Sequence, residues 1–154
     1  MGSLSIRPAA PHDHDAVVAV ADAWWGRPVA DALPRLFLQH FHNTSLIAHD
    51  SAGLGGFLIA FFSPARTGEA YIHFAAVRPD LRRAGVGRGL YETFFDLARA
   101  HGQTSVVAIT PSLNTGSMRF HRTLGFDVLG PLDDYNRQGD AQFVFRRGLE
   151  FRVG

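Results

Sequence analysis

Residues 72–90 read IHFAAVRPDLRRAGVGRGL, and this stretch predicts a strand, a glycine-rich turn and the start of a helix. Its first half is apolar, Pro79 breaks the strand, and Val86 then begins a helical spacing of apolar side chains. Gly85 and Gly87 let the backbone pass close to a ligand and adopt φ values that other residues resist. The first N–H groups of a helix have no partner within the helix, and its dipole favours negative charge there. The stretch therefore predicts an anion-binding turn.

Arg82, Arg83 and Arg88 give this turn charge-assisted donors for phosphate oxygens. We interpret the turn as a pyrophosphate site. A Walker phosphate loop needs Gly-Lys, and the chain contains no Lys. The dinucleotide fingerprint needs a third glycine at the position where this sequence has Leu90. An ordinary strand–loop–helix connection with surface arginines is the alternative interpretation.

Length and composition predict one domain over residues 1–154, with 46% hydrophobic residues and 13 Phe for an aromatic-rich core. The formal net charge of +1 gives no general attraction to nucleic acid or to a membrane surface. Cys is absent from the sequence, which excludes disulfides, thiolate metal sites and a Cys nucleophile. No apolar run has the length of a bilayer span, and the N-terminus lacks a secretory pattern. We therefore expect a soluble cytoplasmic protein that binds neither nucleic acid nor membrane.

The pattern of apolar residues predicts alternating strands and helices that end at Gly or Pro. Strands are expected at residues 4–7, 45–49, 56–62, 69–77, 105–109, 126–129 and 141–146. Helices are expected at residues 16–24, 34–41, 86–102 and 114–124. No internal repeat or interdomain linker interrupts this order.

The pattern Arg82-x-x-Gly85-x-Gly87, preceded by a strand that ends at Val77, resembles the acetyl-CoA signature of the GNAT acetyltransferases. Residues 114–126, NTGSMRFHRTLGF, resemble a second signature of that family. The order of the expected elements also resembles that of the family, so the resemblance covers nearly the whole chain. It implies an α/β (α+β) GNAT fold, with a mixed, mostly antiparallel, twisted sheet of six to seven strands. The sheet is expected to be splayed at the signature strand and flanked by about four helices.

The resemblance implies acetyl-CoA as co-substrate and no metal. The residues implied in binding acetyl-CoA belong to the two signatures and are Ala75, Ala76, Val77, Arg82, Arg83, Ala84, Gly85, Val86, Gly87, Arg88, Asn114, Ser117 and Phe120. Backbone N–H groups around Ala76 and Val77 would hold the thioester carbonyl and its oxyanion. Asn114 would contact the pantetheine arm, and it would also suit a helix N-cap. The run His12-Asp13-His14-Asp15 is interpreted as a helix start and not as a metal site.

His121 is the candidate general acid. Many relatives place at this position a Tyr that protonates the departing thiolate. An imidazole, with an ordinary pKa of about 6.5, leaves some protonated donor near neutral pH. Packing or hydrogen bonding beside the thiol is the alternative role for His121, and Tyr91 and Tyr135 are less well placed donors.

His73 is the first choice for the general base, because an amine must lose a proton before it attacks. Alternation along the signature strand puts Glu69, Tyr71 and His73 on one face. Relatives place a Glu or His at the equivalents of Tyr71 or His73, and Glu69 is our second choice. A His hydrogen-bonded within the sheet is the alternative for His73.

Trp24 and Trp25 lie at the connection between the first two expected helices, which borders the acceptor pocket in the family. One of them is expected to shape substrate binding, and core packing is the alternative for the other. Tyr135 belongs to a late loop at the same pocket. We expect acetyl transfer to a primary amine of a small molecule or peptide, by direct attack in a ternary complex, since a Cys-based acyl-enzyme is impossible. The alternatives are a non-catalytic acyl-CoA-binding or regulatory module, and an acyltransferase with another acyl group or a hydroxyl acceptor. Pairing of late strands, common in the family, favours a homodimer. The acceptor stays open, because variable loops build its pocket.

Overall fold

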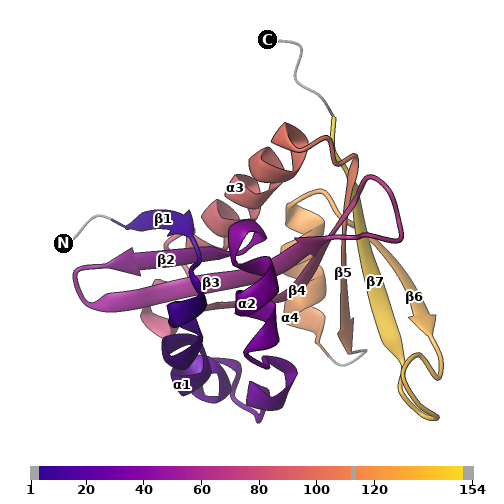
Figure 1. Cartoon of the computed structure of the whole chain (residues 1–154). Coiled ribbons are helices and arrows are strands. Elements are labelled where there is room, and N and C mark those ends of the chain that lie inside the picture. The colour runs from indigo at the N-terminus through magenta and orange to yellow at the C-terminus, as the bar shows by residue number, and fades with distance from the viewer. Residues whose placement is uncertain (1–3, 112–113, 151–154) are drawn as a thin grey trace. The chain divides into compact units, whose positions relative to one another are not determined.

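The computed structural model describes residues 4–111 and 114–150. In these ranges the chain forms seven β-strands and four α-helices (Figure 1). The strands are β1 (Ser5–Pro8), β2 (Leu46–Asp50), β3 (Gly53–Phe62), β4 (Glu69–Val77), β5 (Ser105–Pro111), β6 (Asp127–Leu132) and β7 (Gln142–Gly148). The helices are α1 (His14–Trp25), α2 (Leu36–Phe41), α3 (Val86–Ala100) and α4 (Thr115–Thr123).

The order of elements is the one predicted from the sequence, with boundaries that differ by a few residues. Pro8 belongs to β1, which tolerates a proline because it is an edge strand of the sheet. The helix expected from Pro34 begins at Leu36, because the Pro34 carbonyl first accepts the Phe37 N–H in a turn. The strand expected to end at Leu129 continues as β6 to Leu132.

The chain divides into two units, Met1–Phe61 with Ile72–Leu97, and Phe62–Tyr71 with Ala98–Gly154. The strands follow the order β1-β2-β3-β4 and then β4-β5-β7-β6, and β4 contributes residues to both units. A single domain over the whole chain stays a prediction. No helix in the described ranges has the length and apolar character needed to cross a bilayer.

In the first unit, β1 pairs with β2 and β2 with β3, both antiparallel. In Figure 1, α2 crosses in front of β3. Buried side chains of α1 and α2 form one core with those of β2 and β3. This core consists of fully or almost fully buried apolar side chains, including Val17, Ala21, Leu38, Ile47, Phe57 and Ile59. Apolar burial of this kind is the main stabilising term in a domain of this size.

Helix α3 packs closely on β3 at Gly56. A Cβ at Gly56 would lie 3.1 Å from Leu90 Cδ1 and 3.3 Å from Val86 Cγ1. Successive residues of a strand face opposite sides, so α3 covers the face opposite to the one on which Phe57 meets α1 and α2. The absent side chain at Gly56 therefore lets the first turns of α3 approach the sheet backbone.

In the second unit, β7 pairs with both β5 and β6, antiparallel in each case. Phe145 of β7 is fully buried in this unit. Glu69, at the start of β4, is buried and lies 3.2 Å from the Arg146 guanidinium of β7 and 3.6 Å from that of Arg66. These ion pairs join the beginning of β4 to β7.

Candidate active site

The turn that enters α3 has the conformation expected of an anion-binding turn. Gly85 is left-handed, with φ of +81°, and a Cβ there would meet no atom within 4 Å. Backbone conformation and not lack of space therefore favours glycine at this position. The first intrahelical hydrogen bond joins the Gly89 N–H to the Gly85 carbonyl at 2.9 Å. The N–H groups of the first three helical residues precede this bond and have no acceptor in the helix backbone.

The three arginines predicted to bind phosphate have different surroundings. Arg83 is exposed and makes no ion pair or hydrogen bond with any described residue. Arg82 donates from Nη2 to the Trp24 carbonyl and, at 3.5 Å, from Nε to the Val77 carbonyl. Arg88 lies 3.1 Å from Glu92, one helical turn further on. Arg83 is thus the guanidinium most available to a diphosphate, whereas Arg82 joins the ends of α1 and β4.

Trp25 connects the end of α1 to strand β4 through a hydrogen bond and a ring contact. Its indole N–H donates to the Ala75 carbonyl at 3.2 Å, and its ring packs on Phe74 with 4.7 Å between centroids. Ala75 stands directly before Ala76 and Val77, the residues whose N–H groups are predicted to hold the thioester carbonyl. The end of α1 therefore lies beside this predicted part of the site.

Trp24 and Trp25 have different partners, as the sequence analysis allowed. Trp24 stacks on the buried Phe57 at 6.0 Å, which is a core contact. Trp25 carries the Arg27 guanidinium over its ring, 5.3 Å from the centroid. Arg27 is exposed and forms no ion pair or hydrogen bond within residues 4–111 and 114–150. A cation that pairs with no carboxylate of the described residues therefore lies over the tryptophan that donates to β4.

The His73 ring is fixed by a stacking contact and a hydrogen bond. Its ring lies flat on Phe37, with 4.1 Å between centroids and 4° between planes, and Nε2 lies 2.6 Å from the Ala32 carbonyl. A carbonyl only accepts, so Nε2 carries the proton and Nδ1 has the lone pair. Nδ1 has no hydrogen-bond partner among the described residues. Burial lowers the pKa of His73 below 6.5 against the opposing effect of the Ala32 bond, so the ring is neutral at neutral pH.

His121 is a core residue, and its surroundings do not support the predicted role of general acid. The side chain is buried and stacks on Phe145 at 4.0 Å with 12° between planes. Nδ1 lies 2.7 Å from the Ser117 carbonyl one turn earlier in α4, so the proton of the neutral ring is on Nδ1. Burial lowers the pKa of His121 to about 4. Roughly one ring in a thousand is then protonated at neutral pH, which favours the packing alternative.

The two other residues considered for proton transfer also differ from each other. The Glu69 carboxylate is paired with Arg66 and Arg146, which favours a structural role over that of a base. Burial, followed by the charges of Tyr135 and Glu69, raises the pKa of Tyr71 to about 12. Tyr71 therefore keeps its proton at neutral pH and suits a donor better than an acceptor.

The second signature begins as predicted with a helix N-cap. The Asn114 side-chain oxygen accepts the Ser117 N–H at 3.1 Å and so satisfies one of the unpaired donors of α4. Phe120 meets the His121 ring edge-on at 5.5 Å. Tyr135 is 45% exposed, and its N–H donates to the Asp140 carbonyl. Roles for Asn114, Ser117, Phe120 and Tyr135 toward ligands stay predictions.

Sequence reasoning missed the two supports of His73. Ala32 and Phe37 come from the turn Ala30–Ala32 and from α2, and no local pattern links them to a residue on β4. It also missed Arg78, although a charged residue directly before Pro79, in a chain with Asp50 at a hairpin turn, was a usable signal. Within the described ranges no group of three or more His, Asp or Glu side chains could hold a metal ion.

Known acetyltransferases resemble this chain over most of its length. The family model described as acetyltransferase (GNAT) family matches residues 14–126. The chain is 30% identical over 147 residues to the L-methionine sulfoximine/L-methionine sulfone acetyltransferase of Pseudomonas aeruginosa, covering 84% of each chain. These matches identify an acetyl-CoA-dependent N-acetyltransferase. The chain belongs to the GNAT acetyltransferase family.

Solved structures of other proteins have the same fold. A GNAT-family protein from Desulfovibrio desulfuricans superposes with a TM-score of 0.84 and 21% identity, over 96% of this chain and 100% of the other. Diaminobutyrate acetyltransferase EctA from Paenibacillus lautus, solved with L-2,4-diaminobutyric acid and coenzyme A, gives a TM-score of 0.76 and 16% identity, over 100% of both chains. The predicted α/β GNAT fold, with a seven-stranded sheet and four α-helices in the described residues, is confirmed.

Proposed function

We propose that this enzyme transfers the acetyl group of acetyl-CoA to the primary amine of a small, amino-acid-like acceptor, by direct attack in a ternary complex. The observation that carries the proposal is the state of His73, a neutral imidazole on β4 with its Nδ1 lone pair available. The same strand leads, within the same unit, to the turn at Gly85. A base and an anion-binding turn on one strand–turn–helix segment are what direct transfer to an amine requires.

The chemistry of the Gly85 turn fits a diphosphate. Three helix N–H groups without intrahelical acceptors follow Gly85, and the Arg83 guanidinium is unpaired within the described residues. We propose that these groups hold the pyrophosphate of acetyl-CoA, which supplies an acetyl thioester as the electrophile. The N–H groups of Ala76 and Val77 are proposed to face the thioester oxygen, where donors of this kind stabilise developing negative charge.

In the proposed reaction, the acceptor nitrogen forms a bond to the acetyl carbon while the carbon–sulfur bond breaks. The amine gives its proton to His73 Nδ1, and Phe37 and Ala32 keep the ring in the orientation that accepts it. The sulfur leaves as a thiolate, a good enough leaving group to need no protonated imidazole.

Two observations support an acceptor that carries a carboxylate. The relative from Pseudomonas aeruginosa is named for two amino-acid derivatives, L-methionine sulfoximine and L-methionine sulfone. In this chain, the Arg27 guanidinium forms no ion pair with any described residue and lies over Trp25, whose indole N–H donates to the Ala75 carbonyl of β4. Arginine is well suited to bidentate binding of a carboxylate.

The test is a matched panel of acceptors, with release of free coenzyme A thiol as the signal. L-Methionine sulfone is compared with its methyl ester, its N-acetylated form and its 2-hydroxy analogue. We expect no turnover of the last two compounds, and we expect the ester to raise KM about tenfold because it loses a charge-assisted contact.

Arg27→Gln is the matched variant, and it should raise KM for the acid and leave KM for the ester unchanged. Equal KM values for acid and ester in the parent enzyme would contradict the carboxylate-bearing acceptor. Turnover of the hydroxy analogue at the rate of the amine would contradict transfer to nitrogen.

A further inference from the structure

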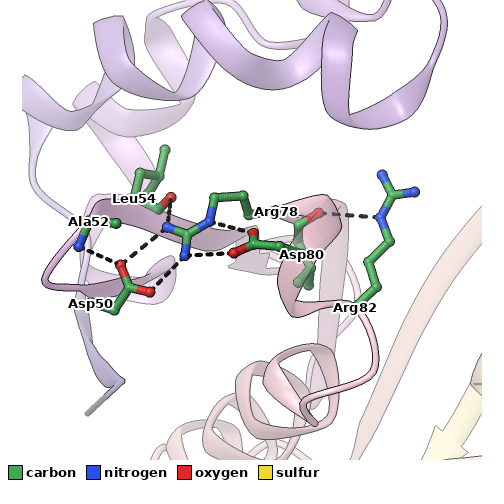
Figure 2. A network of polar contacts seen from close by, with 7 residues as sticks. Asp50, Ala52, Leu54, Arg78, Asp80 and Arg82 are labelled. Carbon is green, nitrogen blue, oxygen red and sulfur yellow. Dashed lines mark hydrogen bonds and ion pairs between the residues drawn. The ribbon is translucent and has the colours of Figure 1, made fainter. Parts of the chain in front are cut away.

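Arg78 is the first residue after β4 and stands directly before the turn Pro79–Leu81 that leads into α3. Its guanidinium binds two carboxylates at once, as Figure 2 shows. Nη2 and Nη1 lie 2.7 and 3.1 Å from the Asp50 oxygens, and Nε and Nη2 lie 2.7 and 3.3 Å from those of Asp80. Nη1 also donates to the Leu54 carbonyl at 3.2 Å. We call these four residues the Arg78 clamp.

The clamp joins the end of β4 to the hairpin turn between β2 and β3. Asp50 ends β2 at that turn and accepts the Ala52 N–H at 2.9 Å (Figure 2). The Arg78 N–H donates to the Gly55 carbonyl at 2.9 Å. The side chains of Arg78 and Asp50 are only 19% and 14% exposed. An ion pair shielded to this degree is screened less by water and salt than a surface pair.

The segment with the Gly85 turn is attached to the sheet on both sides. Leu81 Cδ1 would lie 3.0 Å from a Cβ at Gly55, and Val86 Cγ1 would lie 3.3 Å from one at Gly56, so both pack closely on β3. Arg78 holds the chain at the entrance to this segment. Only residues 82–85 lie between the two attached points, and they include Arg83, whose guanidinium is proposed to bind the pyrophosphate.

We propose that the Arg78 clamp is a positioning device that orders the acetyl-CoA turn before the ligand binds, an inference that rests on the proposed role of the Gly85 turn. A site ordered in advance binds more tightly, because the entropy of ordering is not lost at the moment of binding. Arg78 is therefore a positioning residue and does not itself contact the diphosphate. One guanidinium faces two carboxylates in the clamp, and the resulting net negative charge would not attract an anion.

The carboxylates of the clamp are charged at neutral pH. Hydrogen bonds from Arg78 are the largest effect on both, and they hold the pKa of Asp50 and that of Asp80 below the ordinary range. Direct binding of the anion by Arg78 would require these partners to be displaced. Removing the charge of Asp50 therefore distinguishes the two roles of Arg78. It should weaken acetyl-CoA binding if Arg78 only positions the turn, and it should strengthen binding if Arg78 contacts the anion directly.

The experiment is calorimetric titration with acetyl-CoA of Asp50→Asn and Arg78→Ala. Both should raise Kd about tenfold, with kcat at saturating acetyl-CoA and KM for the acceptor within about twofold of the parent values. Arg78→Lys should recover part of the affinity, since an ammonium keeps the charge but not the fork geometry. Asp15→Asn and Arg35→Ala are matched controls, because Asp15 and Arg35 form an ion pair of 2.7 Å that is exposed and lies outside the clamp.

Gly85→Val tests the proposed acetyl-CoA site independently of the clamp. If Gly85→Val loses acetyl-CoA binding while Asp50→Asn and Arg78→Ala keep the parent Kd, the clamp has no positioning role and the turn keeps its own. If Gly85→Val binds normally, the turn is not the acetyl-CoA site and both proposals fail. Tighter binding by Asp50→Asn would identify Arg78 as a direct ligand. If Asp50→Asn and Arg78→Ala lowered the melting temperature but kept the parent Kd, the clamp would be only a structural ion pair.

Discussion

His73 and His121 have closely similar contacts but differ in their suitability for proton transfer. Each ring lies flat on a phenyl ring, His73 on Phe37 at 4.1 Å and His121 on Phe145 at 4.0 Å. Each also donates one ring N–H to a backbone carbonyl, at 2.6 and 2.7 Å respectively. In both cases burial lowers the pKa of the imidazole. Stacking and a lowered pKa therefore do not distinguish a base from a core residue.

The difference lies in the nitrogen that is used and in the depth of burial. His73 donates from Nε2 to Ala32, a residue 41 positions away, and its half-buried ring keeps the Nδ1 lone pair. His121 donates from Nδ1 to Ser117 within its own helix and is 5% exposed. Proton transfer requires a ring atom that a substrate can reach, and His73 meets this requirement better.

The largest effect is expected from His73→Ala. Loss of a general base lowers kcat about a hundredfold, because most of the acceptor amine is protonated at neutral pH. KM for acetyl-CoA should not change, since His73 lies outside the Gly85 turn. In the parent enzyme kcat should fall as the pH drops below the His73 pKa, which lies below 6.5, and the variant should lack this limb. Steady-state kinetics across this pH range measure both effects.

The matched variant is Ala32→Gly, which keeps the carbonyl that accepts from Nε2 and should retain most of the activity. If His73→Ala kept the parent kcat and the parent pH profile, His73 would be a structural residue like His121. The two histidines would then not differ in function.

A smaller effect, on stability and not on rate, is expected from His121→Phe. The folded-state pKa of His121, about 4, lies below the ordinary 6.5, so between these values the unfolded chain binds the extra proton. Protonation therefore costs the parent up to about 3 kcal/mol of stability as the pH falls from 6.5 to 4, and the Phe variant should escape this loss. Denaturant unfolding at several pH values measures the difference. A large fall in kcat at neutral pH would instead restore His121 as the general acid.

Much of the fold could be predicted because its signals are local. Pro79 and Gly85 mark the ends of a turn in the sequence itself, and the apolar run of β3 indicates a central strand. The end of β6 could not be predicted, because it depends on pairing. Leu132 pairs with Gln142 of β7 only after a register shift that follows Leu129, and no pattern within β6 encodes that partner.

The site could be predicted in part, for the same reason. Alternation along β4 was enough to select His73 as a candidate. The proton position on that ring depends on Ala32, and its orientation on Phe37, which belong to other elements. His121 could be given two roles from the sequence, because the Phe145 that buries it comes from β7, far along the chain. The local pattern left the roles of the two histidines open, and contacts with segments that are distant in the sequence distinguish them.

Phe37→Leu should give the smallest effect and tests the support of His73 directly. Leucine fills much of the space but has no flat face, so the His73 ring gains freedom and water, and kcat should fall about threefold. Burial is what lowers the His73 pKa, so a wetter ring should have a pKa closer to 6.5 and the acid limb of kcat should move to higher pH. Phe41→Leu is the control, because Phe41 contacts Phe37 and Phe61 and should leave the pH profile in place. A Phe37→Leu profile identical to that of the parent would show that the Ala32 hydrogen bond holds the ring without the stack.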